Sequence, residues 1–534
     1  MAHPKFILER NRRFSDSLLW RLQRNFFDRR GARAWTEAVV PHYITSNPWI
    51  ANAYAQVVFG WLRDWYTGPS KATGSAVGGK SDQPFFIVEL GCGSGRFAYL
   101  FLVRFFDLLS RSHLAALPVR SVLTDFTDYN LDILRNHPKL RPFVEAGRLD
   151  FARYDAGEDV DLELGHRGEI LAPGSVARPL AVLANYVFDG IPQDCFTFRD
   201  GRLYESLATL SSRRRETDLD DPELLTRIEI DWQHREASPH YYGDSQLDRL
   251  LGEYVDSLEE TTILFPSSAL RCIRNLRHLS GGRLLLLSAD KGYSDQAALV
   301  GRGEPGISVH GSFSTMVNYH AIGRWFLHRG GNFLVTSYRS ESLNVSAGLL
   351  GRPPAGWVET RLAFDDAIER LGPDDFFSVK KGIETSYEAF SLEQLLAWLR
   401  LSAWDHNIFL GCLPVLTERV VQAPEELRQE VVAAARRVWE LYFPLREPRD
   451  LAFDLGLLVM AMGRWNAGLE YLGHSVRTYG EDPATAFNMA LCHRGLGDEE
   501  AALEQLERAL DLDPELEEAR SLRSAMLAAG GGEE

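Results

Sequence analysis

The sequence predicts an α/β protein, in which a Rossmann-like sheet with helical N-terminal and cap segments is followed by an all-α C-terminal module. From Pro84 onward, short apolar segments alternate with amphipathic ones, as strands and helices do in layered α/β domains. Beyond Arg449, a helical pattern repeats with a period of about 34 residues. A chain of 534 residues is too long for one hydrophobic core, so we expect several folding units.

Composition excludes several classes of protein. A hydrophobic content of 45% and a charged content of 25% are typical of soluble globular chains. No apolar run reaches the roughly 20 residues that a bilayer span needs, so we expect no membrane contact. The net charge of -16 argues against a nucleic-acid partner. Five scattered cysteines without a CxxC pair favour a reducing, cytoplasmic location and argue against a metal site.

We predict the following domain organisation. Residues 1–66 form a helical N-terminal segment, and its many arginines are interpreted as a solvated helix face rather than a targeting peptide. Residues 67–83, rich in glycine and serine, form a flexible linker. The α/β domain covers residues 84–382, with an irregular, charged cap insertion at about 195–280. A helical connector at 386–447 precedes repeats at 450–528.

A glycine-rich turn follows the first predicted strand. Glu89 precedes Gly91, Gly93 and Gly95, and an amphipathic helical run comes next. Glycines in such a turn let a nucleoside-bearing ligand approach bare backbone at the carboxyl edge of a sheet. Arg96 stands where the dinucleotide fingerprint would have its last glycine. This departure and the acidic Glu89 favour S-adenosylmethionine (SAM) over NAD as cofactor, with an ordinary tight turn as the alternative.

Polar residues also stand at the ends of the next three predicted strands. Asp125 ends the second strand, where a carboxylate can accept both hydroxyls of a ribose. Asp155 and Ala156 follow the third strand, where an acid accepts the exocyclic amine of adenine. Asn185 ends the fourth. Each residue alone is explained as a turn former, but the three in this order predict one site at the carboxyl edge of the sheet.

The predicted strand order agrees with this site. The parallel strands are predicted at residues 85–90, 121–125, 149–154, 180–184 and 283–288. Segments 332–337 and 375–380 are predicted to add an antiparallel hairpin. Five parallel strands followed by such a pair are the arrangement of a class I SAM-dependent methyltransferase.

The segment after the fourth strand is the predicted acceptor site. Methyl transfer needs an in-line nucleophile and the exclusion of water, and it needs a base only if the nucleophile arrives protonated. We predict that Asn185, Tyr186 and Asp189 face the acceptor, with Asp189 as base or anchor. The alternative role of Asp189 is to cap the turn that follows it. The segment is not of the Asn-Pro-Pro-Tyr type that acts on nucleic-acid bases.

Four blocks of the chain resemble the MidA-like SAM-dependent methyltransferases, the group that contains the mitochondrial complex I assembly factor that methylates a protein arginine. The blocks lie at residues 43–60, 89–95, 185–192 and 311–319. The second is similar to the family's Glu-Leu-Gly-Pro-Gly-x-Gly turn, and the third to its Asn-Glu-Phe-Phe-Asp-Ala-Leu-Pro segment. The resemblance implies a SAM-dependent enzyme of the methyltransferase class.

Two departures from the family pattern concern the acceptor. Tyr186 stands where the family has glutamate, and Asn318 stands where it has aspartate. Carboxylates are the natural partners of a guanidinium, so both changes put arginine in doubt as the methylated residue. The SAM-binding residues remain.

The C-terminal unit from Phe487 to Pro514 resembles a tetratricopeptide repeat. Small residues stand where paired helices would cross, and Gly497 marks the turn between them. We expect the repeats to recruit a protein or peptide substrate. A small-molecule methyltransferase whose repeats form a homodimer, and an inactive SAM-binding assembly scaffold, remain the alternatives.

Overall fold

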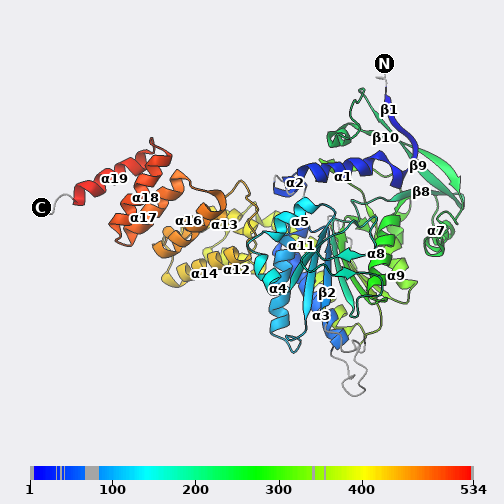
Figure 1. Cartoon of the computed structure of the whole chain (residues 1–534), viewed down its shortest axis with the longest axis horizontal. Helices are drawn as coiled ribbons and strands as arrows, with labels where there is room; N and C mark the ends of the chain where they lie inside the picture. Colours follow the sequence, from blue (N-terminus) through cyan, green and yellow to red (C-terminus); the bar gives the residue numbers. More distant parts are fainter. Residues whose placement is uncertain are drawn as a thin grey trace. The chain divides into compact units, whose positions relative to one another are not determined.

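The structure is a computed structural model that describes residues 5–31, 33–36, 39–40, 43–66, 83–338, 343–353 and 356–530. The chain divides into two compact units, Met1–Phe377 and Ser378–Glu534. The first is mixed α/β and the second is helical, which confirms the α/β class and the helical C-terminal part (Figure 1). The predicted linker lies outside the described residues except for Gln83. Within these ranges, no helix has both the length and the apolar character that a bilayer crossing requires.

A seven-stranded sheet forms the centre of the first unit. Its order is β17-β18-β12-β7-β2-β3-β4. Strands β12, β7, β2, β3 and β4 run parallel to one another, whereas β18 is antiparallel to β12 and to β17. The strands are β2 (Phe85–Leu90), β3 (Val119–Asp125), β4 (Leu149–Arg153), β7 (Leu180–Asn185), β12 (Leu284–Asp290), β17 (Asn332–Val335) and β18 (Asn344–Leu350).

Helices cover both faces of this sheet, which explains why its inner strands are buried along almost their whole length. All six residues of β2 are buried. Phe85 packs against Trp61 of α3 with ring centroids 5.2 Å apart, while Phe86 joins the core formed with α7, α8 and α9. Figure 1 shows α4 on one side of the sheet and α8 and α9 on the other. The helices are α3 (Pro48–Tyr66), α4 (Arg96–Ser110), α7 (Ser245–Ser257), α8 (Ser267–Leu279) and α9 (Tyr319–Leu327).

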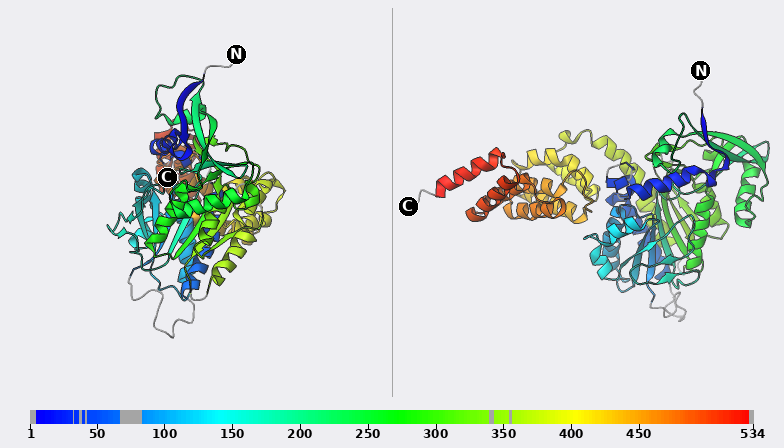
Figure 2. Two further views of the ribbon diagram at one scale, coloured as in Figure 1. Left: turned by 90° about the vertical axis from the view of Figure 1, so that its right-hand side faces the viewer. Right: turned by 45° about the horizontal axis from the view of Figure 1, so that its top comes forward.

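A second, antiparallel sheet corrects the prediction of helical N-terminal and cap segments. Its path is β1-β9-β8-β11, and β10 also pairs with β9. The strands are β1 (Phe6–Arg13), β8 (Asp194–Arg199), β9 (Arg202–Ser212), β10 (Glu229–Ala237) and β11 (Thr261–Phe265). Backbone pairing of β1 with β9, far along the chain, makes the N-terminal segment a strand. The predicted helix that follows does form, as α1 (Leu18–Arg30), and it lies above the carboxyl edge of the large sheet (Figures 1 and 2).

The predicted strand at residues 375–380 is wrong. These residues belong to α11 (Pro373–Ile383), and the antiparallel partner of β12 is β18. Asp374 and Asp375 in the first turn and Lys380 and Lys381 in the last turn complement the helix dipole, a signal that the apolar pattern of the segment concealed.

Shorter elements complete the first unit. They are α2 (Arg33–Thr36), α5 (Asp128–Arg135), α6 (Arg141–Glu145), α10 (Val358–Phe364), β5 (Leu162–Glu163), β6 (Ile170–Leu171), β13 (Gly292–Tyr293), β14 (Ser308–His310), β15 (Ser312–Ser314) and β16 (Val317–Asn318).

Consecutive helices pack in the second unit. Small residues at the helix crossings include Gly468, where a Cβ atom would lie 2.8 Å from the sulfur of Cys492, and the buried Ala490 and Ala502. Gly463 and Gly497 have φ values of +71° and +81° at the turns between paired helices. The helices are α12 (Leu392–Leu401), α13 (His406–Val420), α14 (Glu425–Leu441), α15 (Leu451–Met460), α16 (Trp465–Tyr479), α17 (Pro483–Gly495), α18 (Glu499–Leu512) and α19 (Glu517–Gly530).

Candidate functional site

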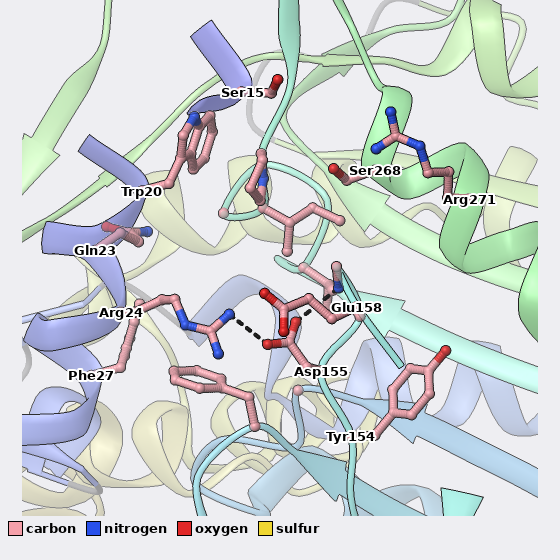
Figure 3. Close-up of a pocket in the computed structure, with 18 of the residues that line it drawn as sticks. Ser15, Trp20, Gln23, Arg24, Phe27, Tyr154, Asp155, Glu158, Ser268 and Arg271 are labelled. Carbon is pink, nitrogen blue, oxygen red and sulfur yellow. Dashed lines mark hydrogen bonds and ion pairs between the residues drawn. The ribbon is translucent and has the colours of Figure 1, made fainter. Parts of the chain in front are cut away.

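A cavity of about 370 Å³ lies at the carboxyl edge of the large sheet, beneath α1 (Figure 3). Its floor comes from the ends of the parallel strands, including Gly91, Asp125 and Asp155. Its roof comes from α1, and its far side from the start of α8 with Ser268 and Arg271. Carboxyl edges of parallel strands meet at one crevice, so residues far apart in sequence share this cavity.

The glycine turn after β2 has the backbone conformation that the sequence predicts. Gly91, Gly93 and Gly95 have φ values of +58°, +50° and +74°, which favour glycine. Gly91 lines the cavity. The other two shape the turn instead: the Gly93 amide donates to Asp125, and a Cβ atom on Gly95 would lie 2.5 Å from the Leu134 side chain. Of the three glycines, Gly91 is therefore the one whose backbone a ligand in the cavity can contact.

Glu89, at the end of β2, is a buried acid. Its exposed fraction is 7%, and its carboxyl group accepts no hydrogen bond from any side chain or amide of the described residues. Burial raises the pKa of Glu89 to about 8. An acid in this setting gains from any ligand that brings an ammonium or N–H group close to it.

Asp125, which the sequence assigns to the ribose, ends β3 and lines the cavity. One of its oxygens accepts from the amide and the hydroxyl of Thr127, both at 3.0 Å, and the other accepts from Asn130 at 3.2 Å. Burial raises the pKa of Asp125, although these hydrogen bonds oppose the rise. These hydrogen bonds hold the side chain in one orientation at the wall of the cavity.

Asp155 and Ala156 line the cavity two and three residues beyond β4. Asp155 accepts from the Gly157 amide at 2.9 Å and forms an ion pair with Arg24 of α1 at 2.5 Å. Figure 3 shows this ion pair crossing the cavity. The Arg24 guanidinium also lies over the Phe126 ring, 5.3 Å from its centroid. Arg24 therefore holds the carboxylate that the sequence assigns to adenine.

The turn after β7 places the three predicted acceptor residues differently. Asn185 accepts a hydrogen bond of 2.7 Å from Tyr54 of α3 and so is tied to the helical layer. Tyr186 has a φ of +51°, a strained value for a bulky residue, and lines the large cavity. Asp189 lines a smaller cavity of about 110 Å³, which also has Tyr186, Gly190 and Gln23 in its wall. Tyr186, Gly190 and Gln23 thus line both compartments, which adjoin each other.

Sequence reasoning missed Asp290 and Lys291. Asp290 ends β12, is fully buried, and is hydrogen-bonded to the Asp189 carboxyl group. Lys291 lines the smaller cavity beside Asp189. The sequence did carry a signal, because an acid at the end of the fifth parallel strand repeats the pattern of Asp125 in the second.

The roof residues were also missed. Trp20, Gln23, Arg24 and Phe27 of α1 line the large cavity, although the arginines of this segment were interpreted as a solvated face. Helical spacing brings these residues to one face of α1. Only the tertiary structure shows that this face covers the strand ends.

A buried carboxylate anchors the roof to the second sheet. Asp194 accepts from Arg13 at 2.8 Å, Ser15 at 2.6 Å, Tyr242 at 2.5 Å and Ser267 at 2.7 Å. Burial alone would raise the pKa of Asp194, but the Arg13 guanidinium and these hydrogen bonds hold it below its usual range. Arg13 and Ser15, which line the cavity, are fixed by this cluster.

Asn318 does not reach the large cavity. It precedes α9, where its side chain accepts from the Ala321 amide at 2.9 Å and donates to the Leu264 carbonyl at 3.3 Å. It lines a separate cavity of about 300 Å³. Asn318 therefore caps α9 and lies away from the large cavity, so this departure from the MidA-like pattern says little about the acceptor.

Comparison with known proteins gives distant structural likenesses only. No family model and no curated protein sequence matches the chain. One similar solved structure is an uncharacterised superfamily protein from Burkholderia thailandensis, with 12% identity and a TM-score of 0.38 over 64% of this chain and 89% of that chain. A second member of that superfamily, from the same organism, was crystallised with S-adenosyl-homocysteine (SAH) and has methyl transfer attributed to it. It has 13% identity and a TM-score of 0.38, over 60% of this chain and 80% of that chain.

Proposed function

We propose that this chain is a SAM-dependent methyltransferase. The observation that carries the proposal is the convergence of Gly91, Asp125 and Asp155 on one cavity at the carboxyl edge of the sheet. The sheet order, with six strands that run in one direction and an antiparallel β18 between β12 and β17, is the arrangement expected of a class I methyltransferase.

The residues present fit the cofactor. Glu89 offers a buried acid, unpaired among the described residues, next to the glycine turn, where the ammonium of the methionyl group would gain most from it. Asp125 would accept the ribose hydroxyls, and Asp155 with Ala156 would hold adenine. Phe126 and Val187 in the cavity wall provide apolar surface for the adenine ring.

When bound, SAM supplies an activated methyl group, so the protein has to position the acceptor and exclude water. The roof of α1 closes the cavity with Trp20, Gln23 and Phe27. Burial raises the pKa of the Tyr186 phenol, so Tyr186 stays protonated and acts as a hydrogen-bond donor toward the acceptor. Asp189, in the adjoining compartment, is the group that can take up a proton.

The acceptor we propose is a protein or peptide. The helical hairpins α15–α16 and α17–α18, with the 34-residue sequence period, support a tetratricopeptide module that would recruit it. The MidA-like resemblance of the glycine turn and of the segment after β7 supports a protein methyltransferase of that kind. A small-molecule methyltransferase is the second candidate, and the small size of the 110 Å³ compartment favours it.

Calorimetry with SAH, SAM and NAD tests the cofactor, and transfer of a labelled methyl group from SAM tests activity. We expect SAH to bind the full-length protein and NAD not to bind. Label transferred to a polypeptide, and lost when residues 450–530 are deleted, supports recruitment by the repeats. Label transferred only to small molecules supports the second candidate. SAH binding with no transfer to any extract component leaves the scaffold alternative.

A further inference from the structure

Asp189 and Asp290 form a buried pair of carboxyl groups. Asp290 is fully buried at the end of β12, and Asp189 is 7% exposed after β7. The two side chains are hydrogen-bonded to each other. Ionised carboxylates only accept hydrogen bonds, so a hydrogen bond between two of them requires a shared proton. The pair therefore carries a single negative charge.

The surroundings decide which member carries the proton. Asp290 Oδ2 accepts from the Phe188 amide at 3.2 Å and from the Tyr319 hydroxyl at 3.4 Å. Asp290 Oδ1 receives no hydrogen bond from a conventional donor among the described residues, which leaves the Asp189 carboxyl as its partner. Burial raises the pKa of both acids, and that of Asp290 more strongly. Asp290 is accordingly the protonated member, and Asp189 is the ionised one.

The other charged and titratable groups near the pair agree with this assignment. Lys291 lines the same compartment as Asp189 and favours its ionised form. Burial raises the pKa of Tyr54, Tyr186 and Tyr319, so these phenols stay neutral. The negative charge of Asp374, which lies on α11, raises the pKa of Tyr186 further. No phenol in this set competes with Asp189 for the role of proton acceptor.

The backbone of Asp189 is fixed as well. Its carbonyl accepts from the Thr315 amide at 3.3 Å and from the Thr315 hydroxyl at 3.0 Å. Thr315 in turn accepts from Gln193 at 2.7 Å. With the side chain held by Asp290 and the main chain by Thr315, the carboxylate keeps one orientation at the wall of the compartment.

We propose that Asp290 is a positioning residue that holds the shared proton and aims an ionised Asp189 at the acceptor. The inference rests on the proposed methyltransferase function and adds the acceptor's chemical class: a nucleophile that carries a proton, such as an N–H or O–H group. That nucleophile forms a bond to the methyl carbon. The carbon–sulfur bond breaks with its electron pair left on sulfur, and the proton of the nucleophile passes to Asp189.

Sinefungin provides the probe, because it has the adenosyl and amino-acid parts of SAM but carries an amine in place of the transferable methyl group. Calorimetry on the full-length protein should give a dissociation constant about tenfold lower for sinefungin than for SAH near neutral pH. The reason is that the sinefungin ammonium is attracted to the ionised Asp189 carboxylate that faces it. Asp189→Asn should abolish this preference and change SAH affinity less than about twofold.

The pH dependence of the preference tests Asp290. In the wild type, the preference should be lost as the pH falls and Asp189 takes up a proton. In Asp290→Asn, the amide donates a weaker hydrogen bond to Asp189 than the shared proton does. Because the hydrogen bond from Asp290 lowers the pKa of Asp189, this pKa should rise in the variant, and the preference should be lost about one pH unit higher. Asp150→Asn is the matched control, because Asp150 is a buried acid on β4 that accepts from the Phe151 and His166 amides, and its replacement should leave the preference unchanged.

The outcomes separate the two proposals. Failure of SAH to bind overturns the proposed function and this inference with it. SAH binding with no preference for sinefungin, or with a preference that survives Asp189→Asn, overturns the role of Asp189 alone. An unchanged pH midpoint in Asp290→Asn overturns the role of Asp290. If Asp290→Asn does not fold, the wild type alone still tests the inference. Its preference for sinefungin should be lost at a pH far above the one at which a lone, exposed acid would lose that preference.

Discussion

Replacing Glu89 by Gln should stabilise the free protein and weaken its affinity for SAM. Burial raises the pKa of this acid from 4.5 to about 8, so between these values the native state binds a proton that the unfolded state does not. Stability therefore falls as the pH rises through this window, and it is highest below the unfolded pKa. Gln stays neutral, so the Glu89→Gln variant does not lose stability as the pH rises through this window.

The magnitude follows from the shift. One pKa unit is worth about 1.4 kcal/mol, which sets an upper bound of about 3 kcal/mol at pH 7. Local relaxation and water at the cavity reduce this to a gain of about 1 to 2 kcal/mol in the free energy of unfolding. Loss of a charged hydrogen bond to the ligand should weaken SAM binding by about 1 to 2 kcal/mol, or roughly 5- to 30-fold.

Urea unfolding from about pH 5 to about pH 8 and calorimetry with SAM measure the two effects. The stability gain of Glu89→Gln should be near zero at the acid end and grow with pH. Asp150→Asn is the control: this buried acid accepts two amide hydrogen bonds, so its replacement should cost stability and leave SAM affinity unchanged. A Glu89→Gln variant less stable than the wild type at neutral pH would refute the reasoning, because it would mean that the acid is ionised and paired.

Three further variants test other parts of the site. Asp125→Ala should weaken SAM binding by about 1 to 3 kcal/mol in calorimetry, and unchanged affinity would contradict the ribose assignment. Arg24→Met should tighten SAH binding by about two- to fivefold, because SAH then need not displace a partly exposed ion pair from Asp155; weaker binding would show that Arg24 contacts the ligand instead. Asp194→Ala should lower the free energy of unfolding by about 2 to 4 kcal/mol at neutral pH, since it leaves Arg13 without its buried partner. The pKa of Asp194 lies below its usual range, so in the wild type this stabilisation should disappear as the pH falls below about 4. If Asp194→Ala loses as much stability at low pH as the wild type does, the stabilising role of the Asp194 carboxylate is wrong.

Local signals in the sequence were enough to predict the residues that form the floor of the candidate site. The apolar run at residues 85–90, bounded by Pro84 and the glycine turn, predicts a buried strand and a tight connection, and β2 occupies that range. Asp125 and Asp155 reach one cavity because parallel strands share a carboxyl edge. The segment at 375–380 failed because its apolar pattern suited a strand as well as a helix.

The sequence by itself determined the α/β class, the positions of the inner strands along the chain and the helical C-terminal part, because these depend on periodicity and on turn chemistry within short windows. Only the tertiary structure decided that residues 6–13 form a strand, that α1 covers the cavity, and that Asp290 meets Asp189. Each of these depends on a partner far along the chain, and a pattern within one segment carries no information about such a partner.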